Sequence, residues 1–264
     1  MVDNEWGDNY LIKLEIMKSL IFINFVRTVL QLIVPDRCRV CGEFISQADR
    51  PGICRICLNK MQILDRQTCH CCGRPIAGAL LEEQICGSCL KVPPPWKRCF
   101  SLVQYDSPVS DLLHNLKYRA DTSVMPALQS IVSEALSTTM HQELKNVDLV
   151  LPVPLHPCRL KERGLNQSAY IAKAIFKPGL VDCSSLKRGK VTIPQTGLTG
   201  IERRRNLRGA FVVHDKASLR GKTICLVDDV FTTGTTVMAC CHALSKGGAT
   251  EIYVVTLARV IVNR

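Results

Sequence analysis

Two adjacent carboxylates followed by a loop rich in hydroxyl side chains are the residues of this chain best suited to chemistry. The carboxylates are Asp228 and Asp229. The segment that follows, which we call the threonine loop, consists of Thr232, Thr233, Gly234, Thr235 and Thr236. Carboxylates suit the vicinal hydroxyls of a ribose or a magnesium ion, whereas hydroxyl donors suit a phosphate. The combination predicts a site for a phosphorylated sugar, with Asp228 and Asp229 as its catalytic residues.

Local patterns predict the elements that position this site. Residues 224–227 form an apolar run, as expected of a strand buried in a parallel sheet, and the acid pair follows it. A helix is predicted from residue 237 to about Lys246, where two glycines stop it. The threonine loop then lies at a helix N-terminus, where free N–H groups and the helix dipole favour a phosphate. An ordinary corner in which Asp228 only caps the helix explains neither the second carboxylate nor the four hydroxyls.

Positive charge suited to a pyrophosphate group is concentrated in three segments, at residues 151–167, 187–190 and 202–208. Between residues 187 and 208 seven basic residues face one acid, and glycines interrupt any continuous helix. A basic, glycine-containing segment beside an active site is typical of a closing lid. Any single arginine here is equally well explained as a solvated surface charge, so the concentration of charge supports the lid.

Paired cysteines form the second chemical pattern of the chain. In four pairs the two cysteines are separated by two residues, a spacing that suits two thiolates on one metal ion. The eight ligand candidates are Cys38, Cys41, Cys54, Cys57, Cys69, Cys72, Cys86 and Cys89. Two pairs complete a four-thiolate site, so we expect two structural zinc ions, with an iron–sulfur cluster as the minor alternative. Sequential and interleaved pairing both remain open, and His70 and Cys71 are not assigned as ligands.

Composition restricts the compartment and the partners. The chain has 264 residues, a formal net charge of +11 and 15 cysteines. This charge points to polyanions, either substrate phosphates or nucleic acid, with a solvated basic surface as the plain alternative. Aromatic content of 5% leaves few surfaces for base stacking. Paired thiols of this kind favour a reducing compartment, so we expect a cytoplasmic protein.

Three regions are predicted along the chain. Residues 1–34 form a tail and an amphipathic helix, residues 35–91 a double zinc-binding module, and residues 96–264 an α/β domain. No transmembrane segment or signal peptide is expected, because polar side chains interrupt the apolar N-terminal run, at Asn24, Arg27 and Gln31. In the last region, strands alternate with helices, including one long helix over residues 126–144. This alternation predicts a mainly parallel sheet with helices on both faces.

The acid pair and the threonine loop resemble the motif that binds phosphoribosyl pyrophosphate (PRPP) in type I phosphoribosyltransferases. From about Leu20 to Arg259 the chain resembles the ComF family of competence-associated proteins, in which a cysteine-rich zinc module precedes a phosphoribosyltransferase-like domain. Besides the cysteine pairs, the matching positions are Tyr105, residues 116–118, 153–157 and 163–167, Gln195, Leu198, Arg203, Asn206 and residues 209–211. Two positions depart from the family pattern. Leu165 stands where phenylalanine is frequent, and Lys190 stands where arginine is usual, with Arg188 as the alternative contact.

This resemblance implies a fold, a ligand and a set of site residues. The fold would be that of the type I phosphoribosyltransferases, and the ligand would be PRPP with magnesium. The acid pair would hold the ribose hydroxyls, and the threonine loop would hold the 5′-phosphate. The remaining substrate-binding residues would be Pro152, Val153, Pro154, Leu155 and Arg163. A flexible loop would contribute Lys190, Gln195, Arg203 and Asn206.

Two functions are compatible with the resemblance. The first is a role in the uptake of single-stranded DNA during natural transformation, with single-stranded DNA, a competence helicase and recombination proteins as partners. The alternative is an active phosphoribosyltransferase that acts on an unknown small-molecule acceptor and has no nucleic-acid role. A transcriptional regulator ranks third, because the sequence contains no evident helix-turn-helix segment. The ligand motif does not separate catalysis from ligand sensing, because both need the same phosphate cradle.

Overall fold

The computed structural model describes residues 36–46, 49–64, 67–76, 78, 84–190 and 200–261, with four residues of the 200–204 stretch described by backbone alone. The amphipathic helix predicted before residue 35 lies outside the described residues. Within them, no helix is both long enough and apolar enough to cross a membrane.

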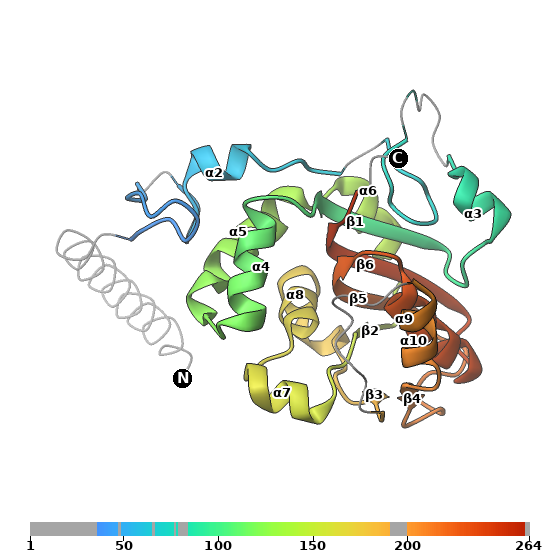
Figure 1. The fold of residues 1–264 in the computed structure, drawn as a ribbon. Helices are drawn as coiled ribbons and strands as arrows, with labels where there is room; N and C mark the ends of the chain where they lie inside the picture. Colours follow the sequence, from blue (N-terminus) through green and yellow to red (C-terminus); the bar gives the residue numbers. More distant parts are fainter. Residues whose placement is uncertain are drawn as a thin grey trace, which may run out of the picture.

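A four-stranded parallel sheet forms the centre of the structure (Figure 1). Its strands are β1 (Arg98–Gln104), β2 (Leu149–Pro152), β5 (Thr223–Phe231) and β6 (Glu251–Arg259), in the order β1-β6-β5-β2. All three pairings are parallel. The near-continuous apolar runs of β5 and β6 are typical of strands buried on both faces. The predicted α/β class is therefore confirmed.

Helices cover both faces of this sheet (Figure 1). On one face lie α4 (Val109–Tyr118), α5 (Met125–Ala135) and α8 (Gln167–Ile175). On the other face lies α10 (Thr235–Lys246), which contacts α9 (Gly200–Leu207). The crossovers between the parallel strands carry these helices, as the strand–helix alternation of the sequence predicts.

Two hydrophobic cores result, because alternate side chains of a strand point to opposite faces. Cys225 and Val227 of β5 belong to the first core, which they share with α4, α5 and α8. Ile224 and Leu226 belong to the second core, which they share with α10.

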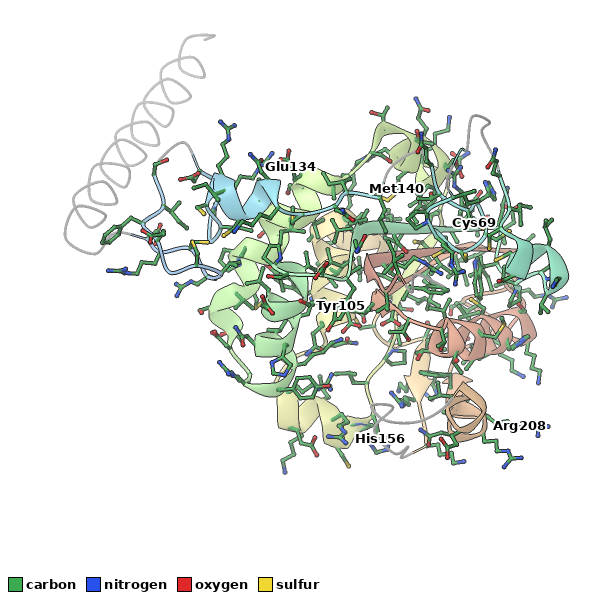
Figure 2. All side chains as sticks on the ribbon, turned by 45° about the horizontal axis from the view of Figure 1, so that its top comes forward. Cys69, Tyr105, Glu134, Met140, His156 and Arg208 are labelled. Carbon is green, nitrogen blue, oxygen red and sulfur yellow. The ribbon has the colours of Figure 1, made fainter. Side chains whose placement is uncertain are left out.

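The cysteine-rich segment divides between the two cores. Its short helix α2 (Arg55–Asn59) packs with the first core through Cys57, whereas Cys69 and Cys72 belong to the second core. The helix α3 (Gly87–Lys91) lies on the opposite flank of the sheet from α2 (Figure 1). Figure 2 shows the same separation, with Glu134 near α2 and Cys69 on the other flank.

Smaller elements connect the main layers. An antiparallel pair, β3 (Leu186–Arg188) with β4 (Phe211–Val213), forms a separate two-stranded sheet. The remaining elements are η1 (Thr122–Val124), α6 (Thr138–Leu144), α7 (Pro157–Arg163) and η2 (Pro178–Leu180).

Two expectations about element boundaries were wrong. The single helix predicted over residues 126–144 is broken, because Leu136 is extended and Ser137 starts α6 by accepting a hydrogen bond from the Met140 N–H at 3.2 Å. The strand expected to end at Val227 continues to Phe231. It continues because β6 also extends further and pairs with it through Arg259. The acid pair therefore lies within a strand and is held in register by the sheet.

Candidate functional site

The acid pair lies near the carboxyl end of β5, where the ligands of open α/β sheets usually bind. Asp228 is buried, and its Oδ1 accepts hydrogen bonds from Ser168 Oγ at 3.1 Å and from the Asp229 N–H at 2.9 Å. Burial, reinforced by the negative charge of Asp229, raises the pKa of Asp228 to about 7. Around neutral pH this carboxyl group can therefore accept or release a proton.

Asp229 is neutralised by a lysine from another helix. Its Oδ2 lies 2.8 Å from Nζ of Lys117, near the end of α4, and the two side chains are only 15% and 18% exposed. Burial by itself lowers the pKa of Lys117, but the attraction of Asp229 outweighs burial and raises it. Lys117 stays charged and holds the acid pair in place.

Sequence reasoning did not identify Lys117 or Ser168 as site residues. Lys117 entered only as part of the family resemblance, and Ser168 was assigned only to a helix. Each lies far along the chain from the acid pair, so only the fold brings them together. The local signal for Lys117 is a lysine at the end of an otherwise apolar helix face, which is too common to be specific.

The threonine loop has the backbone of an anion site. Gly234 adopts a φ of +73° and directly precedes α10, a helix of 12 residues with no acidic residue in its first turn. A Cβ at Gly234 would lie 2.6 Å from Cζ of Phe231, so only glycine fits there. The hydroxyls of Thr233 and Thr235 lie 2.8 Å apart, and Thr232 is exposed. Free N–H groups, hydroxyls and the positive end of the helix dipole therefore meet at one point.

The loop after β2 lies beside the acid pair because β2 pairs with β5. The Val153 N–H donates to the Val227 carbonyl at 2.8 Å, and Asn166 Nδ2 donates to the Val153 carbonyl at 3.0 Å. Pro152 is buried, while Pro154 and Leu155 are half-buried. The structure therefore brings the predicted substrate-binding residues 152–155 to the same sheet edge as the acid pair.

Basic side chains gather on this side of the sheet. The Cζ of Arg163 lies 6.0 Å from the ring centroid of Tyr118, the residue after Lys117. Arg188 stacks over Phe211 at 5.5 Å. Burial lowers the pKa of Arg188, and the nearby positive charges of Arg159 and Arg163 lower it further. The negative charge of Asp228 acts in the opposite direction and raises this pKa. These four groups are therefore close enough to interact electrostatically.

The predicted flexible loop is only partly described. Lys190 is exposed, whereas Arg188 is half-buried and interacts electrostatically with Asp228, so of these two residues Arg188 is the better candidate for the ligand contact. Asn206 is half-buried on α9. Gln195 lies outside the described residues, and only the backbone of Arg203 is described.

The eight predicted cysteine ligands form two groups with sequential pairing. Within each group all Sγ atoms lie within 4.8 Å of one another. The first cysteine cluster is Cys38, Cys41, Cys54 and Cys57, and the second cysteine cluster is Cys69, Cys72, Cys86 and Cys89. The Sγ atoms of Cys41 and Cys54 are 3.7 Å apart, and those of Cys72 and Cys86 are 3.8 Å apart.

Both clusters fit the coordination of a structural zinc ion, which prefers four thiolates in a closed tetrahedron. In each, the glycine after the second cysteine has a positive φ, +79° at Gly42 and +67° at Gly73. Neither His70 nor Cys71 belongs to a group. None of the 15 cysteines forms a disulfide, and all of them lie in the described part of the chain.

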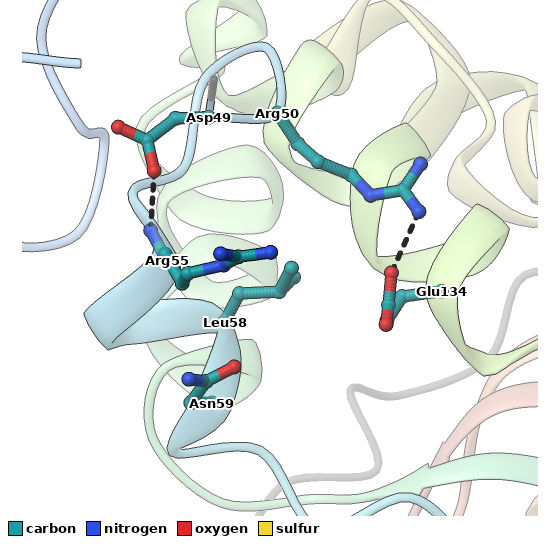
Figure 3. Close-up of a pocket in the computed structure, with 6 residues that line it drawn as sticks. All are labelled: Asp49, Arg50, Arg55, Leu58, Asn59 and Glu134. Carbon is teal, nitrogen blue, oxygen red and sulfur yellow. Dashed lines mark hydrogen bonds and ion pairs between the residues drawn. The ribbon is translucent and has the colours of Figure 1, made fainter. Parts of the chain in front are cut away.

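A cavity of about 400 Å³ lies elsewhere, between α2 and α5 (Figure 3). Its lining residues are Asp49, Arg50, Arg55, Leu58, Asn59 and Glu134. None of them belongs to the acid-pair site. Arg50 is already paired with Glu134 at 2.7 Å across it, so the cavity is an opening between the first cysteine cluster and the sheet-covering helices.

Comparison with known proteins agrees with these two kinds of site. The double zinc ribbon domain family matches residues 29–90, and the phosphoribosyl transferase domain family matches residues 170–263. The second match includes the acid pair and the threonine loop. The chain thus contains a double zinc ribbon followed by a phosphoribosyltransferase domain.

Relatives along nearly the whole chain define the family. The "DNA utilization protein YhgH" of Escherichia coli O157:H7 is 32% identical over 233 residues, which cover 87% of this chain and 100% of the relative. "Competence protein F" of Haemophilus influenzae is 34% identical over 232 residues, which cover 84% and 96%. The chain belongs to the ComF/YhgH family. A purine phosphoribosyltransferase from Pyrococcus horikoshii is 19% identical over 52% of this chain and 78% of its own, with a TM-score of 0.29, and we base no argument on it.

Proposed function

We propose that this protein binds PRPP with magnesium at the acid pair and threonine loop. The observation that carries the proposal is the placement of Asp228 and Asp229 beside an anion-suited helix start, with basic side chains on the same edge of the sheet. Asp228 and Asp229 would accept hydrogen bonds from the ribose hydroxyls, and the threonine loop would donate to the 5′-phosphate. Residues 152–155, Arg163 and Arg188 would face the pyrophosphate.

Magnesium fits this arrangement because its preferred ligands are carboxylate and phosphate oxygens. When bound, it would neutralise charge on the pyrophosphate. The chain itself supplies Lys117, which forms an ion pair with Asp229, and Ser168, which orients Asp228. Residues of the 187–208 segment would cover the ligand and exclude water.

Phosphoribosyl transfer is the reaction that such a site supports. The bond between ribose C1 and the pyrophosphate oxygen breaks, and a bond from C1 to the acceptor forms, while the acceptor loses a proton. The protein contributes positioning and charge neutralisation. We assign no general base for the acceptor, because the proton-exchanging Asp228 is assigned to the ribose hydroxyls. The same cradle therefore also serves a protein that senses PRPP.

We further propose a cytoplasmic role in the uptake or use of single-stranded DNA. The names of the relatives refer to DNA utilization and competence, and the chain carries a net charge of +11. A competence helicase and recombination proteins are the partners that this role implies. Because aromatic residues make up only 5% of the chain, contacts would be chiefly with phosphates, and binding would weaken steeply with salt.

The second candidate is a phosphoribosyltransferase for a small-molecule acceptor, with no nucleic-acid role. The complete acid pair favours it, because a site that only served DNA binding would not need two carboxylates facing a polyanion.

Calorimetric titration of PRPP–magnesium tests the ligand assignment. We expect the wild-type chain to bind, and Asp229→Asn to bind at least about tenfold more weakly, because an amide accepts hydrogen bonds less strongly than a carboxylate and cannot form the ion pair with Lys117. Asp148→Asn is the matched control, since Asp148 accepts from the Thr223 N–H at the other end of β5. Equal PRPP affinities of the wild-type chain and Asp229→Asn, with both proteins shown to be folded by thermal unfolding, would contradict the assignment.

Fluorescence anisotropy with a labelled single-stranded oligonucleotide tests the DNA role. The measurement is made at two salt concentrations, with and without PRPP–magnesium. Tight, salt-sensitive binding that PRPP alters supports a DNA protein with a coupled ligand site. Absence of binding favours the small-molecule transferase, whose acceptor would then be sought by pyrophosphate release.

A further inference from the structure

Arg259, the last residue of β6, is a buried cation without a carboxylate partner. It is only 3% exposed, and no acidic side chain of the described residues forms an ion pair with it. A buried guanidinium is costly unless a negative group compensates its charge. Its neighbours must therefore supply that negative charge.

The second cysteine cluster is the negative neighbour of Arg259. Nη1 donates to the Cys72 carbonyl, and Nη2 lies 3.6 Å from the Cys72 Sγ. Four thiolates around one divalent zinc ion carry roughly two excess negative charges. A guanidinium beside the sulfurs compensates part of that charge, and a metal-loaded cluster in turn makes the burial of Arg259 favourable.

The same guanidinium also supports the threonine loop. Its Cζ lies 4.4 Å from the ring centroid of Phe231, the last residue of β5. The ring of Phe231 fills the space that a Cβ at Gly234 would need, so Phe231 and the threonine loop are in direct contact. Trp96 packs edge-on against Phe231 at 6.2 Å, and its Nε1 donates to the Cys71 carbonyl. Arg259 therefore links Cys72 of the second cysteine cluster to Phe231, and Trp96 links Phe231 to Cys71, the residue before Cys72.

The first cysteine cluster packs on the other side of the sheet from Phe231. Cys38, Cys54 and Cys57 belong to the first core, whereas Phe231 belongs to the second core. The module of the first cluster contacts α5 through Gly52, where a Cβ would lie 2.6 Å from the Ala127 nitrogen, and through the exposed Arg50–Glu134 ion pair. Those two contacts reach α5, and the segment after α2 also reaches β1, where the Leu64 N–H donates to the Leu102 carbonyl at 2.9 Å.

We propose that Arg259 is a positioning residue that couples the two sites. With metal in the second cysteine cluster, Arg259 holds Phe231, and Phe231 holds the threonine loop in its phosphate-binding conformation. Metal occupancy of this cluster then tunes the affinity for a phosphate-bearing ligand. The ligand half of this inference rests on the proposed function, whereas the metal half does not.

The test uses the full chain and two readouts. Arg259→Met removes the positive charge but keeps a long side chain. Arg259→Lys keeps the positive charge but lacks the planar guanidinium and its paired N–H donors. Zinc release to a colorimetric chelator and PRPP–magnesium affinity by calorimetry are measured for each. We expect Arg259→Met to release one of two zinc ions about 10- to 100-fold faster and to bind PRPP about five- to tenfold more weakly. Arg259→Lys should recover part of the zinc retention.

Two further variants keep the test decisive. Arg98→Met is the matched control. Arg98 lies in the neighbouring strand β1 and also stacks on an aromatic ring, at 4.6 Å from Phe100, but its ion pair is with Glu143 and not with a cysteine cluster. It should change neither readout. Phe231→Leu retains Arg259 and should weaken PRPP binding while both zinc ions are released at the wild-type rate. This variant reports on the link even if Arg259→Met fails to fold.

The outcomes separate this inference from the proposed function. If the wild-type chain binds PRPP and both Arg259→Met and Phe231→Leu bind it with the same affinity, the coupling is overturned. No PRPP binding by the wild-type chain overturns the proposed function and the ligand half together. Zinc release from Arg259→Met at the wild-type rate overturns the metal half in either case.

Discussion

The two cysteine clusters have the same ligand spacing but different surroundings. The first packs against the core beneath α5, and one of its four cysteines, Cys41, is exposed. The second packs against the core beneath α10 and is contacted by the buried Arg259. The ribbons are thus alike in sequence, while the faces of the sheet to which they attach differ.

This difference shows that one metal-binding motif can have two structural roles. The first cluster anchors its segment to the helix layer through buried residues such as Ile53 and Cys57. The second cluster contacts Arg259 at the end of β6, and β6 pairs with β5, the strand that carries the acid pair and leads into the threonine loop. Predictions that separate the two clusters therefore test whether the second ribbon is part of the ligand site.

Removal of one ligand from each cluster gives the largest expected effect. Cys57→Ser and Cys69→Ser alter buried cysteines, 2% and 0% exposed, and each should reduce the zinc content from two ions to one. Because structural zinc contributes about 10 kcal/mol to folding of small zinc domains, both variants should lose several kcal/mol of local stability. Elemental analysis and thermal unfolding measure these losses.

Ligand affinity then distinguishes the clusters. Cys69→Ser should weaken PRPP binding, whereas Cys57→Ser should leave it within about twofold of wild type, which is the scatter allowed for sites that are not coupled. Equal weakening in both variants would remove the distinction between the two ribbons.

The partners of the acid pair, Lys117 and Ser168, come from helices on the side of the first core. The pH dependence of stability tests the surroundings of Asp228 on that side, independently of the second cysteine cluster. The pKa of Asp228 is raised from about 3.8 to about 7, mainly by burial and then by Asp229, so the fold favours the neutral carboxyl. Its contribution to stability is fully present below about pH 4 and is lost as pH rises through about 7.

Asp228→Asn keeps an oxygen acceptor but never ionises. Its stability relative to wild type should therefore be greater at pH 8 than at pH 5, by about 3 kcal/mol. Denaturant unfolding at the two pH values measures the difference, and zinc retention should be unchanged. A pH-independent difference would show that Asp228 does not titrate in this range.

The two knuckle glycines form a matched pair with a smaller expected effect. A Cβ at Gly42, in the first cluster, meets nothing within 4 Å, so Gly42→Ala should cost only the positive-φ strain of about 1 kcal/mol. A Cβ at Gly73, in the second cluster, lies 3.0 Å from Ser101 Oγ and 3.2 Å from the Cys99 carbonyl. Gly73→Ala should therefore cost about 2–3 kcal/mol. Chemical denaturation of both variants compares them, and equal losses would show that the second ribbon is no more tightly packed.

The smallest effect is expected at the ion pair between the first module and α5. Arg50 and Glu134 are 47% and 39% exposed, so solvent screens most of their attraction. A double-mutant cycle with Arg50→Gln and Glu134→Gln should give a coupling energy below about 1 kcal/mol. A larger coupling energy would mean that this ion pair contributes substantially to holding the first module against α5.

Much of the site could be predicted because its signals are local. An apolar strand, an acid pair, a glycine-containing hydroxyl loop and a helix follow one another between residues 223 and 246, and the two-residue cysteine spacing is equally local. The helix break at Ser137 was also a local signal, an N-cap residue that the apolar periodicity obscured. The region boundaries at residues 35–91 and 96–264 stay predictions.

The partners of these local motifs could not be predicted in the same way. Lys117 reaches Asp229 across more than one hundred residues of chain, and Arg259 and Cys72 are 187 residues apart in the sequence. Lysines and arginines are common at such positions, and nothing in their neighbouring sequence indicates which charge they will meet. Their roles depend on the order of the strands in the sheet.

The sequence by itself determined the ligands and the backbone of each site: eight paired thiols, two carboxylates, and a glycine where only glycine fits. Short-range sterics and coordination chemistry set these, so they are visible in a few consecutive residues. Only the tertiary structure decided that the cysteines pair sequentially, that Lys117 neutralises Asp229, and that one ribbon contacts the strand ends through Arg259. Those contacts arise because burying both faces of a parallel sheet brings distant charges into a low-dielectric interior, where each must find a partner.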